Sequence, residues 1–196
     1  MRKPLSWIGP LSGFLRERYG SEQRIAASAI LTFEQSYQGI DGDSAASAEL
    51  YALLSRIAEL PMRQDIAVTG SINQHGEIQA IGGVNEKIEG FHRSCAMKGL
   101  TGRQGVLVPE ANVRNLMLSR EVLDDVQAGR FHVWSATDVD AGLALLSGHA
   151  AGERRADGSF PEGTVHGLIA ERLARWAELA AQAENGAHDT PGAAGA

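Results

Sequence analysis

Two glycine-containing turns of this chain each lead to a side chain that could take part in nucleophilic catalysis. Ser44 ends the run Gly-Asp-Ser, and Lys87 ends the run Gly-Gly-Val-Asn-Glu-Lys. A hydroxyl is a weak nucleophile at neutral pH and needs a nearby base that removes its proton. A lysine amine can be that base only when it is uncharged, a form that burial in an apolar site favours. The pair therefore predicts acyl transfer, with Ser44 attacking and Lys87 accepting the proton.

Both turns are expected to lead into helices. Apolar residues recur at three- and four-residue spacing over 44–59, before Pro61, and again over 84–97, before Gly99. The free N–H groups in the first turn of a helix that begins at Ser44 would face a developing oxyanion. Thr69 lies between the two turns on an expected strand, where its hydroxyl could hold the lysine amine.

Strands and helices alternate along the rest of the sequence. The pattern predicts a mixed α/β domain with two layers, in which helices pack on a mixed sheet. A hairpin is expected at His75-Gly76. Asn112 is expected to cap a helix that runs to Gly129. The expected strands are 24–34, 66–72, 77–81, 105–108 and 131–134, and a further short helix is expected over 138–146.

Composition changes along the chain and divides it into four parts. Residues 1–148 are expected to form the folded domain, and 149–165, which are polar and contain glycine, a linker. Apolar residues at helical spacing predict an amphipathic helix over 166–182. The last stretch, 183–196, is rich in Gly and Ala and is expected to be a disordered tail.

Charge and composition exclude several classes of function. The chain has 196 residues, 43% of them hydrophobic, and a net charge of −6 with scattered basic residues, which argues against nucleic-acid binding. No apolar run approaches the roughly 20 residues that a membrane-spanning helix needs. The single cysteine, Cys95, excludes an internal disulfide and favours a reducing compartment, with the cytoplasm as the expected location. The six histidines lack metal-ligand spacing, so no metal site is expected.

The motifs around these residues resemble the proteolytic domain of Lon protease (endopeptidase La), and more closely its Lon-B-like branch. The resemblance extends from about Leu11 to Leu146 and implies a fold similar to domain 2 of ribosomal protein S5. It is carried by the runs Phe-Glu-Gln-Ser-Tyr at 33–37, Gly-Ile-Asp-Gly-Asp-Ser-Ala at 39–45, Val-Thr-Gly-Ser at 68–71, Gly-Glu-Ile at 76–78, Ile-Gly-Gly-Val-Asn-Glu-Lys at 81–87 and Pro-Glu-Ala-Asn at 109–112.

The resemblance assigns roles to five residues. It implies that Ser44 is the nucleophile, Lys87 the general base and Thr69 the hydroxyl partner of the lysine. It further implies that Asp41 and Asp43 flank the site and adjust its opening. From the residues alone, these two aspartates are equally well explained as turn and N-cap residues.

The resemblance also implies partners for the chain. In such proteases a hexameric ring of these domains receives unfolded polypeptides from an AAA+ ATPase module. This chain contains no Gly-x-x-x-x-Gly-Lys-Ser/Thr phosphate loop. ATP and Mg²⁺ are therefore expected only on a separate or missing ATPase module, and no cofactor is expected in this chain.

Relatives carry further strands before the segment that resembles Leu11–Leu15, whereas only Met1–Pro10 precede it here. The N-terminal strands of the domain are therefore expected to be truncated, which would leave an unpaired sheet edge.

The sequence raises three alternatives to a Lon-type peptidase. A chymotrypsin-type site is excluded because it needs an upstream histidine, and none precedes Ser44. The main alternative is a catalytically silent assembly or adaptor domain derived from a Lon-type protease, as the shortened N-terminus would allow. A third alternative is a ligand-binding domain of similar topology, against which the presence of both Ser44 and Lys87 argues.

Overall fold

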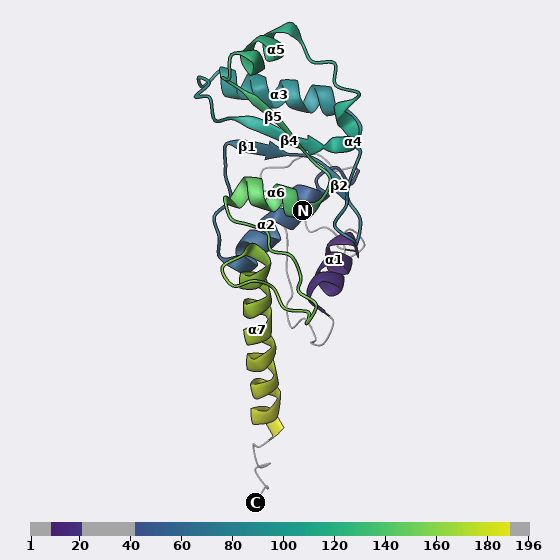
Figure 1. Ribbon diagram of the computed structural model, residues 1–196, viewed down its shortest axis with the longest axis vertical. Helices are drawn as coiled ribbons and strands as arrows, with labels where there is room; N and C mark the ends of the chain where they lie inside the picture. Colours follow the sequence, from purple (N-terminus) through teal and green to yellow (C-terminus); the bar gives the residue numbers. More distant parts are fainter. Residues whose placement is uncertain (1–8, 21–41, 189–196) are drawn as a thin grey trace, which may run out of the picture.

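Helices and strands alternate through the parts of the chain that the computed structural model describes, residues 9–20 and 42–188. The predicted strand at 24–34 and the side chain of Asp41 lie outside these ranges. Figure 1 shows how the elements are arranged. The helices are α1 (Gly9–Tyr19), α2 (Ala46–Ala58), α3 (Val84–Ala96), α4 (Glu110–Val113), α5 (Arg120–Gln127), α6 (Val139–Ser147) and α7 (Val165–His188). The strands are β1 (Ile66–Val68), β2 (Ser71–Ile72), β3 (Ile78–Gln79), β4 (Gly105–Pro109) and β5 (His132–Ala136).

The described strands form a parallel sheet in the order β1-β4-β5 and a separate antiparallel pair, β2-β3. The strand predicted over 66–72 is thus split at Thr69 and Gly70. Thr69 N–H still bonds to Leu107 O, but Gly70 N–H donates to Ser44 O at 2.8 Å. The chain therefore leaves the parallel sheet where its backbone pairs with the turn at Ser44, an interaction that no local pattern indicates.

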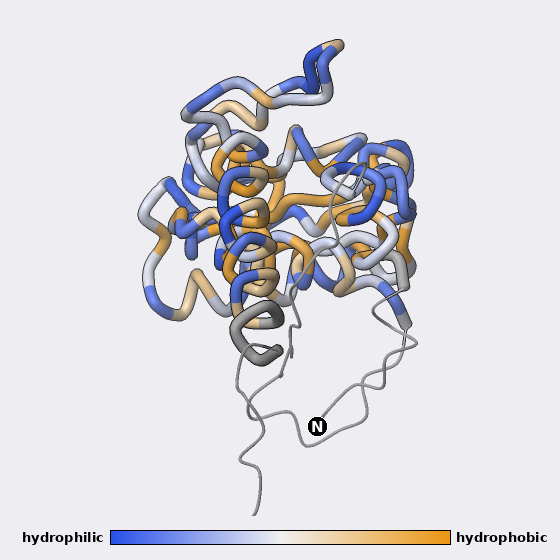
Figure 2. Tube along the Cα trace, turned by 90° about the horizontal axis from the view of Figure 1, so that it is seen from below, coloured by the Kyte–Doolittle hydropathy of each residue, from blue (hydrophilic) through white to orange (hydrophobic). Residues whose placement is uncertain are grey.

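Helices cover both faces of the parallel sheet, so the described domain has three layers where the sequence predicted two (Figure 1). All five residues of β4 are buried, as expected for a parallel strand enclosed on both sides. Val106 and Val108 pack with α3 and α5, whereas Leu107 faces α2 and α6. Figure 2 shows hydrophobic residues gathered in the interior and hydrophilic ones along the outer turns.

The helix predicted from Asn112 to Gly129 is instead two helices, α4 and α5, joined by an irregular segment. Amide groups of this segment bond to α3: Met117 N–H donates to the Asn85 side chain, and Ser119 N–H donates to Glu89. These tertiary partners replace helical hydrogen bonds and account for the break. Asn112 lies within α4, and Ser119 is the N-cap of α5.

Helix α7 packs its first half against α2 and then projects from the body of the molecule (Figure 1). Val165, Ile169 and Leu173 are buried at four-residue spacing. The helix continues to His188, beyond the predicted end at 182, and the sequence has no helix-breaking proline until Pro191. The start of the predicted tail is corrected accordingly. No helix in the described ranges combines the length and apolar character needed to cross a bilayer.

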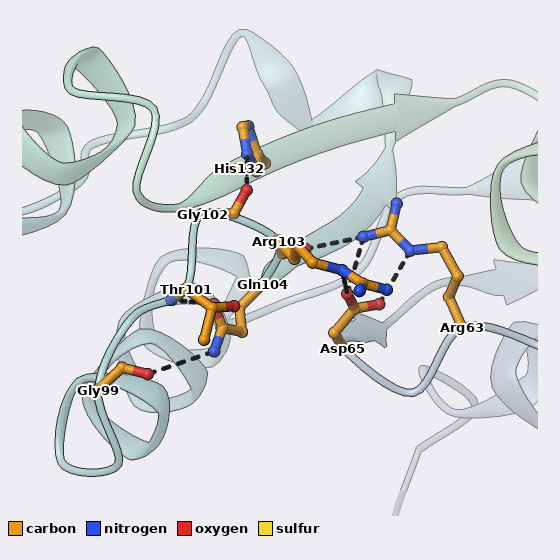
Figure 3. Close-up of polar contacts among 8 residues, drawn as sticks. All are labelled: Arg63, Asp65, Gly99, Thr101, Gly102, Arg103, Gln104 and His132. Atoms are coloured by element: carbon orange, nitrogen blue, oxygen red, sulfur yellow. Dashed lines mark hydrogen bonds and ion pairs between the residues drawn. The ribbon is translucent and has the colours of Figure 1, made fainter.

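Polar contacts fix the amino ends of the three parallel strands (Figure 3). Asp65, directly before β1, accepts hydrogen bonds from Arg63 at 2.9 and 3.0 Å and from Arg103 at 3.1 Å. Nε2 of His132, at the start of β5, is 2.9 Å from Gly102 O. Gly102 and Arg103 lie in the same loop before β4. The strand that ends next to Thr69 is thereby held at its opposite end.

Candidate active site

The structure brings Ser44 and Lys87 into direct contact. Nζ of Lys87 donates a 2.7 Å hydrogen bond to Oγ of Ser44. Lys87 lies in the first turn of α3. Gly83, the N-cap of this helix, has a left-handed conformation with φ of +67°. Ser44 lies in the turn before α2. Two turns that are distant in sequence thus place a nucleophile and a base within reach of each other.

Thr69 is the third member of this group. Lys87 Nζ donates to Thr69 Oγ1 at 3.3 Å, and Thr69 Oγ1 in turn donates to the main-chain oxygen of Ser44 at 3.2 Å. Because the proton of the Thr69 hydroxyl points to Ser44 O, the lone pairs of that hydroxyl remain available to Lys87. Thr69 is buried and therefore holds the lysine amine in a fixed direction.

The turn around Ser44 differs from the expected helix start. Helix α2 begins at Ala46, and the amides of Ala46 and Ser47 donate to Asp43 O and Gly70 O at 2.9 and 3.0 Å. These two groups are therefore not free to face an oxyanion. Within the described ranges, the amides of Ser44 and Ala45 donate no hydrogen bond and remain as candidate donors.

Asp43 is exposed, and its Oδ2 accepts a 2.6 Å hydrogen bond from Oγ of the buried Ser71. The alternative role of Asp43 as an N-cap does not apply, because Ala45 occupies that position and makes no side-chain cap. The sequence analysis assigned no role to Ser71. Its position directly after the Val-Thr-Gly run that contains Thr69 is the feature that could have indicated its place near the site.

A cavity of about 300 Å³ opens beside the pair. Small apolar side chains form most of its wall; it is lined by Ser44, Ala45, Ala67, Val68, Thr69, Lys87 and Val106. Lys87 itself is exposed, contrary to the expectation of a buried lysine, because the first turn of α3 lies at the surface.

Other reactive side chains lie away from this site. His92 is buried and bonds to Asp125 at 2.6 Å. Cys95 is only partly buried. In the described part of the chain, no group of three or more His, Cys, Asp or Glu side chains is arranged to hold a metal ion.

Comparison with known proteins identifies a matching family and several relatives. The model of the Lon protease (S16) C-terminal proteolytic domain matches residues 36–144. A Lon protease homolog of Escherichia coli K12 is 51% identical over 136 residues, which cover 69% of this chain and 23% of that protein.

Two further relatives also match this chain over only a small part of their own length. A Lon protease homolog of Haemophilus influenzae is 42% identical over 146 residues, 74% of this chain and 24% of that protein. The archaeal Lon protease of Methanocaldococcus jannaschii is 46% identical over 83 residues, 42% of this chain and 12% of that protein. The matched part of the chain thus spans less than a quarter of each relative.

Proposed function

The chain belongs to the Lon protease family through its proteolytic domain, and we propose that it is a serine peptidase with Ser44 as nucleophile and Lys87 as general base. The observation that carries this proposal is the 2.7 Å contact between Lys87 Nζ and Ser44 Oγ. A hydroxyl next to an amine that can accept its proton meets the geometric requirement for nucleophilic catalysis.

In the proposed mechanism, uncharged Lys87 removes the proton of Ser44 as Oγ attacks the carbonyl carbon of the scissile peptide bond. The resulting tetrahedral oxyanion accepts hydrogen bonds from the amides of Ser44 and Ala45. The carbon–nitrogen bond then breaks, and Lys87 passes its proton to the leaving amine. A water molecule, deprotonated by the same lysine, hydrolyses the ester, and the proton returns to Ser44 Oγ.

Thr69 orients the base throughout this sequence. One N–H of the lysine amine donates to Thr69 Oγ1, which aims the lone pair of the uncharged nitrogen at the Ser44 hydroxyl. A base held in one direction avoids the entropic cost of finding the reactive arrangement at each turnover.

The proposed substrate is an unfolded polypeptide. An extended chain could place an apolar side chain in the cavity whose wall includes Ala67, Val68 and Val106. A substrate bound there would also cover Lys87 and exclude water from it, and desolvation favours the uncharged amine that the mechanism needs. Lys87, which is exposed in the structure, would thus become an effective base once a substrate covers it.

The proposal also covers the assembly, the partner module and the cellular location of the chain. Because the chain belongs to the Lon protease family, we propose that it works within a hexameric ring and with an AAA+ ATPase module, which would carry any ATP and Mg²⁺. The mechanism uses no cofactor in this chain. A single cysteine supports a cytoplasmic location. Mass measurement in solution tests the ring, and a monomer at all concentrations would count against it.

The experiment that tests the peptidase measures release of a fluorophore from an unstructured peptide. Ser44→Ala and Lys87→Ala are each expected to lower kcat by at least about a hundredfold, the lower range for general acid–base catalysis. Lys98→Ala removes an exposed lysine beyond the end of α3 and is expected to leave kcat unchanged. Equal turnover by wild type and Ser44→Ala would favour a catalytically silent assembly domain instead.

A further inference from the structure

We propose that Ser71 is a positioning residue that acts through Asp43 to hold the turn presenting Ser44 to Lys87. This inference rests on the proposed function, since the role it assigns is in the reaction of that pair. Ser71 begins β2, is 4% exposed, and its hydroxyl donates at 2.6 Å to Oδ2 of Asp43. The residue directly before the nucleophile is thus joined by its side chain to a buried strand residue.

The carboxyl side of Ser44 is held by the main chain. Gly70 N–H donates to Ser44 O at 2.8 Å, and Ser47 N–H donates to Gly70 O at 3.0 Å. These bonds join the stretch from Ser44 into α2 to the segment that leaves β1. On the amino side of Ser44, the main-chain bond is the one that Ala46 N–H donates to Asp43 O at 2.9 Å.

On this side, a side-chain contact adds to the main-chain bond at Asp43. Gly42 has φ of +81°, a conformation that glycine adopts without steric cost. The next residue, Asp43, is exposed, so without a partner its carboxylate would be solvated. The Ser71 hydroxyl supplies that partner, and hydrogen bonds to an ionised acceptor are stronger than those between neutral groups. The contact therefore restricts the turn immediately before the nucleophile.

A restriction of this kind acts on rate more than on substrate binding. Ser71 does not line the cavity beside Ser44 and Lys87. Its loss would leave the substrate wall intact but would widen the range of positions that the Ser44 hydroxyl samples. Small misplacements of reacting groups cost up to about a hundredfold in rate. Removal of the contact is therefore expected to lower kcat with little change in KM.

The test is a double-mutant cycle with the fluorogenic peptide. Ser71→Ala and Asp43→Ala are each expected to lower kcat about tenfold, within the cost of a misplaced reacting group. The double variant is expected to be no slower than the slower single variant, because both changes remove the same contact. Asp43→Asn keeps an oxygen that accepts from Ser71 and is expected to retain more activity than Asp43→Ala.

A matched control separates positioning from a general loss of stability. Ser55→Ala removes another 2.6 Å hydroxyl bond, to Leu60 O at the far end of α2, and is expected to leave kcat unchanged. Wild-type kcat in Ser71→Ala, or additive losses in the double variant, would overturn the positioning role while a Ser44-dependent peptidase remained. Turnover that persists undiminished in Ser44→Ala would reject the proposed function, and the role of Ser71 with it.

Discussion

Both polar atoms of the Asn112 carboxamide bond to the main chain of Ile81. Nδ2 donates to Ile81 O, and Oδ1 accepts from Ile81 N–H, each at 2.9 Å. Asn112 is 4% exposed and lies in α4, whereas Ile81 precedes the glycine turn that leads to Lys87. A buried amide thus fixes the start of the segment that carries the proposed base.

Replacement of this amide is expected to destabilise the protein. Asn112→Ala leaves the N–H and O of Ile81 without their partner, and such a loss costs about 2 kcal/mol in the free energy of unfolding. Urea denaturation measures the change. Asn115→Ala, at an exposed position in the segment after α4, is the control and is expected to have little effect. Equal midpoints for wild type and Asn112→Ala would contradict the role of the amide.

Removal of the Thr69 hydroxyl is expected to slow catalysis. Thr69→Val keeps the shape of the side chain but removes the acceptor for Lys87 Nζ and the donor to Ser44 O. We expect kcat to fall about tenfold or more, since the base loses its fixed direction. Thr69→Ser retains the hydroxyl and should be close to wild type in a peptide-hydrolysis assay. If both variants behave alike, the hydroxyl does not orient the lysine.

Close packing between α2 and α6 makes Gly142 sensitive to substitution. A Cβ at this position would overlap with Oη of the buried Tyr51. Gly142→Ala is therefore expected to lower the free energy of unfolding by about 1–3 kcal/mol, the usual cost of overpacking. Thermal unfolding would record this as a lower Tm.

The matched control for Gly142 lies in α3. Gly90 has no atom within 4 Å of an added Cβ, so Gly90→Ala is expected to raise stability by up to about 1 kcal/mol through helix propensity. Tyr51→Phe should restore part of the loss in Gly142→Ala, because it removes the closest atom. A stabilising effect of Gly142→Ala would show that the two helices are less tightly packed than the structure indicates.

A buried network predicts how stability depends on pH. His166 is fully buried, with Nε2 2.9 Å from Asp140, and Asp140 also accepts from Arg18 at 3.0 Å. Burial acts to raise the pKa of Asp140, but the hydrogen bond and charge of His166, together with Arg18, outweigh it and hold the pKa below its ordinary value. The folded chain thus binds this proton less readily than the unfolded chain.

Stability from Asp140 is therefore present above the unfolded pKa of about 3.9 and is lost as pH falls through the lower folded value. We expect Asp140→Asn to weaken the fall in stability on acidification below about pH 5, the range over which a depressed aspartate pKa acts. Urea midpoints measured from pH 3 to 7 test this expectation. An identical acid dependence in wild type and Asp140→Asn would contradict the assigned coupling to His166 and Arg18.

Residue patterns along the chain were sufficient to predict α2, α3, β4 and α6 within about two residues, the usual uncertainty of helix and strand ends. Each of these elements has a clear apolar period or an end marked by a glycine, a proline or a capping side chain. The motifs also predicted that Ser44, Thr69 and Lys87 belong to one site, and the structure places their side chains together.

The tertiary structure alone decided which backbone and side-chain groups pair across the fold. The split of 66–72 at Gly70, the place of Asn112 inside α4 and the contact of Ser71 with Asp43 each depend on a partner more than 20 residues away. Local periodicity records which face of an element is buried, but it carries no information about which distant donor meets which acceptor. For the same reason the exposure of Lys87 was not foreseen, because burial depends on how the separate segments close over one another.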